Sequence, residues 1–113
     1  MKTIAELKSA KLRETLEAVK AEIQRIAGDG ARMIVYGSYA RGEERDDSDV
    51  DLMVILPDEK YTFEIKDEIH DAVFEIGYEA EFLISIFFAS ESIARKFEGF
   101  KVFASVEREG VLV

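Results

Sequence analysis

Residues 36–56 read Tyr-Gly-Ser-Tyr-Ala-Arg-Gly-Glu-Glu-Arg-Asp-Asp-Ser-Asp-Val-Asp-Leu-Met-Val-Ile-Leu. An apolar run ends in Gly37-Ser38, a few helix-forming residues follow, and a second apolar run opens with Asp49 and Asp51. Because successive side chains of a strand point to opposite faces, a strand over residues 49–56 places these two aspartates on one face. Adjacent carboxylates repel each other unless a cation lies between them. The pair therefore predicts a metal site.

The alternative is that Asp49 and Asp51 are two solvated acids at the entry of a strand, since Asp46 and Asp47 make the preceding loop acidic. Asp51, however, lies inside the apolar run. Burial of an unpaired carboxylate costs on the order of several kcal/mol, so a metal ion or a hydrogen-bond donor is expected beside it. Mg²⁺ suits an all-oxygen site, and Mn²⁺ suits it as well.

The segments around this stretch alternate between helical and strand periodicity. The predicted helices cover residues 3–27, 38–41, 62–76, 91–97 and about 100–110, and the predicted strands cover residues 33–36, 49–56 and 79–88. Thr3 and Glu6 have capping-box spacing, Gly28 and Gly77 are expected to end helices, and Ser90 is expected to cap one. We predict an α/β (α+β) fold with a small mixed β-sheet flanked by helices, and one domain over residues 1–113.

Composition narrows the classes of function. The 113 residues carry a net charge of −9 and include no cysteine, which excludes disulfides, thiolate nucleophiles and thiolate metal sites. The acidic balance argues against a long nucleic acid as partner, because neutralisation of phosphates by basic residues drives such binding. No apolar run approaches the roughly 20 residues of a membrane helix, and the N-terminus lacks the apolar segment of a signal peptide. We expect a cytoplasmic protein without a membrane partner.

Gly37 and Ser38 lie where a strand gives way to a short helix. Backbone N–H groups at such a junction suit phosphate oxygens, glycine allows close approach, and the Ser38 hydroxyl adds a donor. A Gly-Ser pair alone is more often an ordinary turn, so the phosphate interpretation depends on the aspartates that follow.

The two segments together resemble a known signature. Gly37-Ser38-Tyr39-Ala40-Arg41-Gly42, followed by Asp47-Ser48-Asp49-Val50-Asp51-Leu52, is similar to the motif of the minimal nucleotidyltransferases, which belong to the DNA polymerase beta-like nucleotidyltransferase superfamily. The resemblance implies a polymerase beta palm-like fold. It implies that Gly37 and Ser38 bind a nucleoside triphosphate, and that Asp49 and Asp51 are catalytic and hold two Mg²⁺ ions. Arg41 contacts a phosphate or, equally, pairs with Asp47 or Asp49 to brace the loop, while Ser48 is expected to cap the loop.

The family carries a third carboxylate on a neighbouring strand. Because residues 79–88 are predicted to form that strand, Glu81 is the first choice for the third catalytic and metal-binding acid, and Glu79 is the second. This assignment departs from the aspartate of the family pattern.

The resemblance also implies an activity and a partner. The enzyme would transfer AMP from ATP, or another nucleoside monophosphate, to a hydroxyl of a HEPN-family toxin and act as the antitoxin of a toxin–antitoxin pair. The alternative is a catalytically weak or inactive binding module that masks or assembles with a partner protein. The position of the third carboxylate discriminates between the two. Formation of a homo-oligomer stays open at this point.

Overall fold

The computed structural model describes residues 1–113. Its helices are α1 (Ala10–Ala27), α2 (Ser38–Arg41), α3 (Phe63–Ala80), α4 (Glu91–Lys96) and α5 (Lys101–Glu109). Its strands are β1 (Lys2–Thr3), β2 (Arg32–Tyr36), β3 (Val50–Leu56), β4 (Ile84–Ser90) and β5 (Val111–Leu112). Short 3₁₀ turns cover Ile4–Glu6 and Asp58–Lys60.

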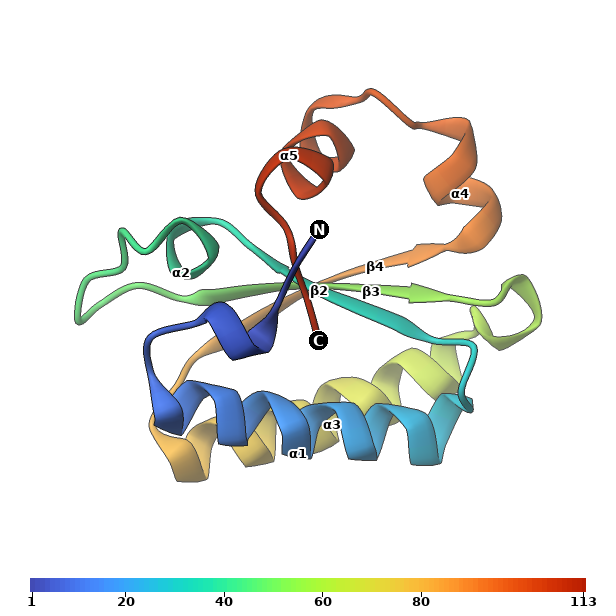
Figure 1. Ribbon diagram of the computed structural model, residues 1–113. Coiled ribbons are helices and arrows are strands. Elements are labelled where there is room, and N and C mark those ends of the chain that lie inside the picture. The colour runs from blue at the N-terminus through green and yellow to red at the C-terminus, as the bar shows by residue number, and fades with distance from the viewer.

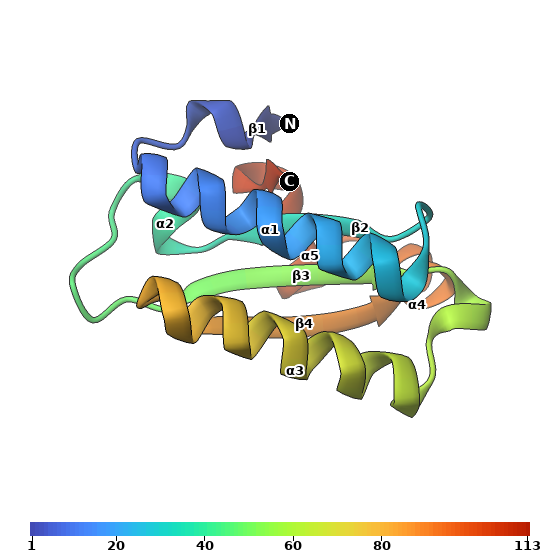
Figure 2. The same ribbon diagram turned by 90° about the horizontal axis from the view of Figure 1, so that it is seen from below.

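The five strands form one mixed sheet in the order β1-β5-β2-β3-β4. β3 runs antiparallel to β2 and parallel to β4, while β5 runs antiparallel to β2 and parallel to β1. Helices α1 and α3 cover one face of the sheet, and α4 and α5 cover the other (Figures 1 and 2). The predicted mixed sheet with flanking helices is confirmed.

The central strand β3 explains why both faces are covered. Val50, Leu52 and Val54 point into the larger core, where they join the apolar residues of α1. Met53 and Ile55 point to the opposite face, where Phe103 and Val106 of α5 complete a smaller core. Asp51 is the one residue of β3 that is not buried. Because it shares the face of Met53 and Ile55, it lies on the side of the sheet that α5 covers.

The N-terminal segment differs from the predicted single helix over residues 3–27. Thr3 N–H does donate to the Glu6 carboxylate at 2.9 Å, as capping-box spacing predicts, but this contact starts only the short 3₁₀ turn. The long helix begins at Ala10, where the Ser9 hydroxyl accepts from Leu12 N–H at 3.1 Å. The chain bends between the two helical segments so that Leu7 is buried in the core. The predicted helix end at Gly28 is confirmed.

The predicted helix end at Gly77 and the predicted strand start at residue 79 are wrong. Helix α3 continues to Ala80, Glu81 takes the left-handed cap conformation with φ of 64°, and β4 begins only at Ile84. Gly77 is a packing glycine, because a Cβ there would meet the Phe82 carbonyl oxygen and the Ile84 side chain. The predicted cap at Ser90 is confirmed, since its hydroxyl accepts from Ile93 N–H at 3.1 Å.

Sequence periodicity missed the two terminal strands, which have only two residues each. Their pairing matters for the site. Val111 of β5 pairs with Val35 of β2, two residues before Gly37, so the last turn of α5 is held beside the end of β2. No helix of the molecule combines the length and apolarity needed to cross a membrane.

Candidate active site

The antiparallel register of β2 and β3 brings the two halves of the motif together. Tyr36, the last residue of β2, pairs with Asp51, the second residue of β3, so Gly37 follows directly beside the aspartate. Gly37 has a φ of 79°, and a Cβ built on it would overlap Asp51 Oδ2. Position 37 therefore requires glycine both for its backbone conformation and for the space that the Asp51 carboxylate occupies.

The surroundings of Asp51 disfavour its charged form. Partial burial raises the pKa of Asp51, the negative charge of Asp49 raises it further, and the Arg41 guanidinium opposes both effects. Burial and the Asp51 charge also raise the pKa of Tyr36. The carboxylates of Asp49 and Asp51 provide hard oxygen ligands and negative charge, which fit Mg²⁺ or Mn²⁺.

The residue that faces this pair from the neighbouring strand is a serine. Ser85 of β4 is the register partner of Asp51, and its hydroxyl donates a long hydrogen bond of 3.4 Å to Asp49 Oδ2. Glu79 lies in α3, and Glu81 forms the exposed cap of that helix, so neither belongs to the strand predicted to carry the third acid. No three acidic or histidine side chains of the molecule lie close enough to hold a common metal ion. Glu81 does line an open hollow together with Asp49, but Asp51 lies outside that hollow.

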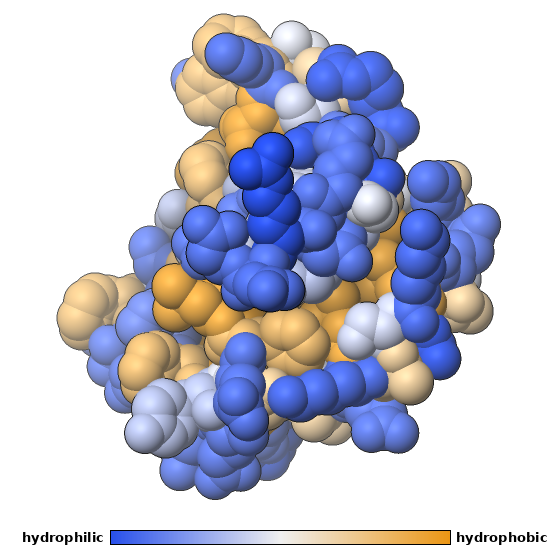
Figure 3. All heavy atoms as spheres, turned by 90° about the vertical axis from the view of Figure 1, so that its left-hand side faces the viewer, coloured by the Kyte–Doolittle hydropathy of each residue, from blue (hydrophilic) through white to orange (hydrophobic).

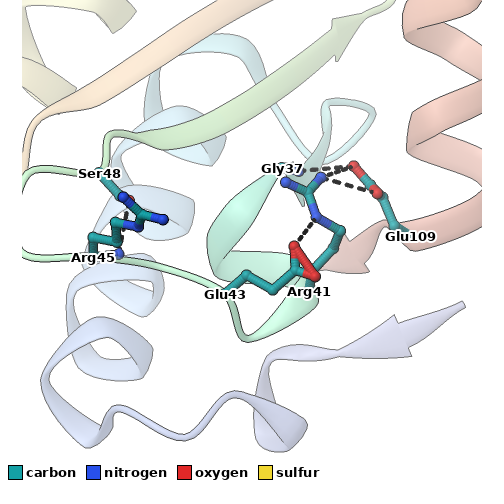
Figure 4. A network of polar contacts seen from close by, with 6 residues as sticks. All are labelled: Gly37, Arg41, Glu43, Arg45, Ser48 and Glu109. Atoms are coloured by element: carbon teal, nitrogen blue, oxygen red, sulfur yellow. Dashed lines mark hydrogen bonds and ion pairs between the residues drawn. The ribbon is translucent and has the colours of Figure 1, made fainter.

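Arg41 pairs with carboxylates other than Asp47 and Asp49, the two that the sequence analysis considered. Its Nε donates to Glu43 at 2.9 Å, and its Nη1 donates to Glu109 at 3.1 Å, whereas Asp47 and Asp49 are not among its partners (Figure 4). The alternative in which Arg41 pairs with Asp47 or Asp49 to brace the loop is therefore wrong, and the alternative in which it contacts a phosphate stays a prediction. The Arg41 charge nevertheless opposes part of the rise in the pKa of Asp51, so the guanidinium belongs to the same electrostatic environment.

The loop between α2 and β3 is tied by a serine, as expected. Ser48 accepts a hydrogen bond from Arg45 N–H through its hydroxyl at 2.8 Å, and its own N–H donates to the Arg45 carbonyl at 3.0 Å (Figure 4). This loop forms one end of the molecule, where hydrophilic residues cover most of the surface and apolar residues are visible between them (Figure 3).

Sequence reasoning missed Glu109, in the last turn of α5. Its Oε1 accepts a hydrogen bond from Gly37 N–H at 3.1 Å as well as from Arg41. The side chain is only 16% exposed, against 42% for that of Arg41. No local pattern could have identified this residue, because 72 residues separate it from Gly37.

Asp51 borders an open cavity of about 740 Å³, whereas Asp49 lines the separate hollow near Glu81. Gly37, Ser38 and Asp51 line it from the sheet side, and Lys101, Ser105 and Glu109 line it from α5. The last three residues recur at steps of four along the helix, so they form one face of α5. Two cationic side chains, Arg41 and Lys101, and the hydroxyls of Ser38 and Ser105 thus surround a space that opens onto the Asp51 carboxylate.

The comparisons with known proteins agree with this geometry. The model of the nucleotidyltransferase domain family matches residues 12–105, and the chain belongs to that family. Among solved structures, a toxin–antitoxin crystal structure with AMP-PNP is 15% identical and superimposes with a TM-score of 0.51, over 85% of this chain and 70% of that chain. At this identity the likeness shows the fold alone, and the family match identifies it as the nucleotidyltransferase fold that the motif predicted.

A crystal structure of a candidate nucleotidyltransferase from Sulfolobus solfataricus is 12% identical, with a TM-score of 0.45 over 92% of this chain and 86% of that chain. No curated protein gives a significant match to this sequence.

Proposed function

We propose that this chain transfers AMP from ATP to a hydroxyl group of a partner protein. The observation that carries the proposal is the contact between Gly37 and Asp51, which joins the predicted phosphate-binding turn to the predicted metal-binding pair. In this reaction the acceptor oxygen forms a bond to the α-phosphorus and the bond to the β-phosphate bridging oxygen breaks. Pyrophosphate leaves with the electron pair, and the acceptor proton passes to solvent.

The residues of the chain have distinct roles in this proposal. Asp49 and Asp51 hold divalent cations, Mg²⁺ or Mn²⁺, and Ser85 orients Asp49 through its hydroxyl. Such cations, when bound, supply positive charge that stabilises the attacking and leaving oxygens. Gly37 N–H and the Ser38 hydroxyl bind the triphosphate, and Arg41 adds a charged donor at the edge of the same cavity.

The partner is proposed to be a HEPN-family toxin, with this chain as its antitoxin. The toxin–antitoxin structure with AMP-PNP, which has the same fold, supports this proposal. The net charge of −9 supports it as well, because an acidic protein attracts a basic, RNA-binding partner.

A second candidate function is a binding module that neutralises its partner without catalysis. Ser85 favours this alternative, because a hydroxyl stands at the register position where the family pattern expects a third carboxylate. A site with two acids binds divalent cations more weakly than a site with three. The two candidates differ in whether the partner becomes covalently modified.

Labelled ATP distinguishes the two candidates. The chain is incubated with Mg²⁺, ATP labelled at the α-phosphate and the protein encoded next to it, in parallel with Asp51→Asn and with Asp67→Asn, a charge-matched control on the exposed side of α3. The proposal expects label on the partner with the unchanged chain and with Asp67→Asn, and none with Asp51→Asn. A stable complex without label in any sample would instead establish the binding module.

A further inference from the structure

Glu109 occupies two of the donors that the proposed function assigns to the triphosphate, Gly37 N–H and Arg41. Its carboxylate accepts from Gly37 N–H at 3.1 Å, and both of its oxygens lie within 3.2 Å of Arg41 Nη1 (Figure 4). A carboxylate and a phosphate bind such donors in the same way, through negatively charged oxygens. We infer that Glu109 is a built-in competitor of the nucleotide: its carboxylate occupies these two donors until a triphosphate displaces it. This inference rests on the proposed function.

Charge makes joint occupancy unfavourable. Asp51 already lies beside the turn, because a Cβ on Gly37 would overlap its Oδ2. A triphosphate that bound with Glu109 in place would meet a second carboxylate at the same donors, and like charges at contact distance repel each other. The phosphates therefore gain Gly37 N–H and Arg41 only when the Glu109 side chain moves away.

The backbone of Glu109 is fixed, so the exchange involves a side chain and not a helix. Phe103 and Val106 anchor α5 in the smaller core, and Val111 pairs with β2 just beyond it. Gly110 packs so tightly that a Cβ would meet the Val106 carbonyl oxygen and Ile34. Rotation of the Glu109 side chain toward the open cavity is sufficient to free both donors, because Glu109 itself lines that cavity.

Competition of this kind lowers apparent affinity. When only a fraction of molecules has the site free, the apparent dissociation constant rises by the inverse of that fraction. The Glu109 contacts are charge-assisted and partly buried, so we expect their removal to tighten triphosphate binding about tenfold.

The test compares the unchanged chain with Glu109→Gln, which keeps the shape of the side chain and removes its charge. The matched control is Glu107→Gln, an exposed residue of the same helix. Titration calorimetry with AMP-PNP and Mg²⁺ should show about tenfold tighter binding for Glu109→Gln and no change for Glu107→Gln. Glu109→Gln should also bind inorganic tripolyphosphate more tightly than the unchanged chain does, but not adenosine, since Glu109 competes with phosphate oxygens.

Thermal unfolding separates competition from a purely structural role. Glu109→Gln should lower the melting temperature without ligand, because an ion pair is lost, and should enlarge the increase that AMP-PNP with Mg²⁺ produces. A structural role alone would lower the melting temperature and leave that increase unchanged. Equal or weaker AMP-PNP binding by Glu109→Gln would overturn the inference alone, whereas absence of AMP-PNP binding in every variant would overturn the proposed function with it.

Discussion

The substitution Gly37→Ala tests the contact that joins the two halves of the site. The backbone of Gly37, with φ of 79° and ψ of −155°, lies in a region that is essentially restricted to glycine. An alanine there costs about 1–3 kcal/mol in backbone strain alone. The added Cβ also overlaps Asp51 Oδ2, and rotation of the aspartate away from its preferred geometry adds about 1 kcal/mol. The expected total is about 2–4 kcal/mol.

Gly28→Ala is a matched control for the backbone term. Gly28 has φ of 85° and ψ of 179°, close to the conformation of Gly37, but no atom lies within 4 Å of its Cβ position. The free energy of unfolding, measured by urea denaturation of the metal-free proteins, should fall by the strain cost in both variants. In Gly37→Ala it should fall by about 1 kcal/mol more.

A double-mutant cycle attributes that additional cost to the carboxylate. The Asp51 Cβ lies 3.5 Å from the position of the added methyl group, an ordinary contact, so in an Asp51→Ala background Gly37→Ala should cost no more than Gly28→Ala. Equal destabilisation by Gly37→Ala and Gly28→Ala in the unchanged background, together with undiminished AMP-PNP binding by Gly37→Ala, would refute the close packing of Gly37 on Asp51.

Three further outcomes follow from the aspartate pair. Because burial and Asp49 raise the pKa of Asp51 above its ordinary value of 3.8, the metal-free fold loses stability as the pH rises from that value through the raised pKa. Asp51→Asn should therefore raise the melting temperature slightly at neutral pH and flatten this part of its pH profile. Ser85→Asp should lower the melting temperature without metal and tighten Mg²⁺ binding, as measured by calorimetry, since it adds a carboxylate at the register position of Asp51. Glu81→Gln should leave Mg²⁺ binding unchanged; a clear loss would restore Glu81 as the third metal ligand.

The parts of the site that are local in sequence could be predicted. Alternation along residues 49–56 placed Asp49, Asp51, Met53 and Ile55 on one face, and the structure puts Asp51, Met53 and Ile55 on the face that α5 covers. Gly37 and Asp51 belong to one continuous motif, and a short connection brings them together. Such features depend on side-chain period and turn chemistry, which the sequence encodes over a few residues.

The parts that depend on packing between distant segments could not be predicted. The start of β4 is set by the packing of Gly77 on Phe82 and Ile84, which lets α3 run on to Ala80 and places Ser85, not Glu81, beside Asp51. A glycine in a helical pattern is more often an end signal, so periodicity favoured the wrong boundary. The role of Glu109 arises from the two-residue strand β5, which is too short to show any period.

The position of the label in ATP provides the most direct test of the central claim that this site performs nucleotidyl transfer. The chain, Mg²⁺ and the protein encoded next to it are incubated in parallel with ATP labelled at the α-phosphate and with ATP labelled at the γ-phosphate, and the label on the acceptor is measured. Nucleotidyl transfer predicts that the α-label is incorporated, that the γ-label is not, and that Asp51→Asn abolishes incorporation. Incorporation of the γ-label, or equal α-labelling by Asp51→Asn, would contradict the account.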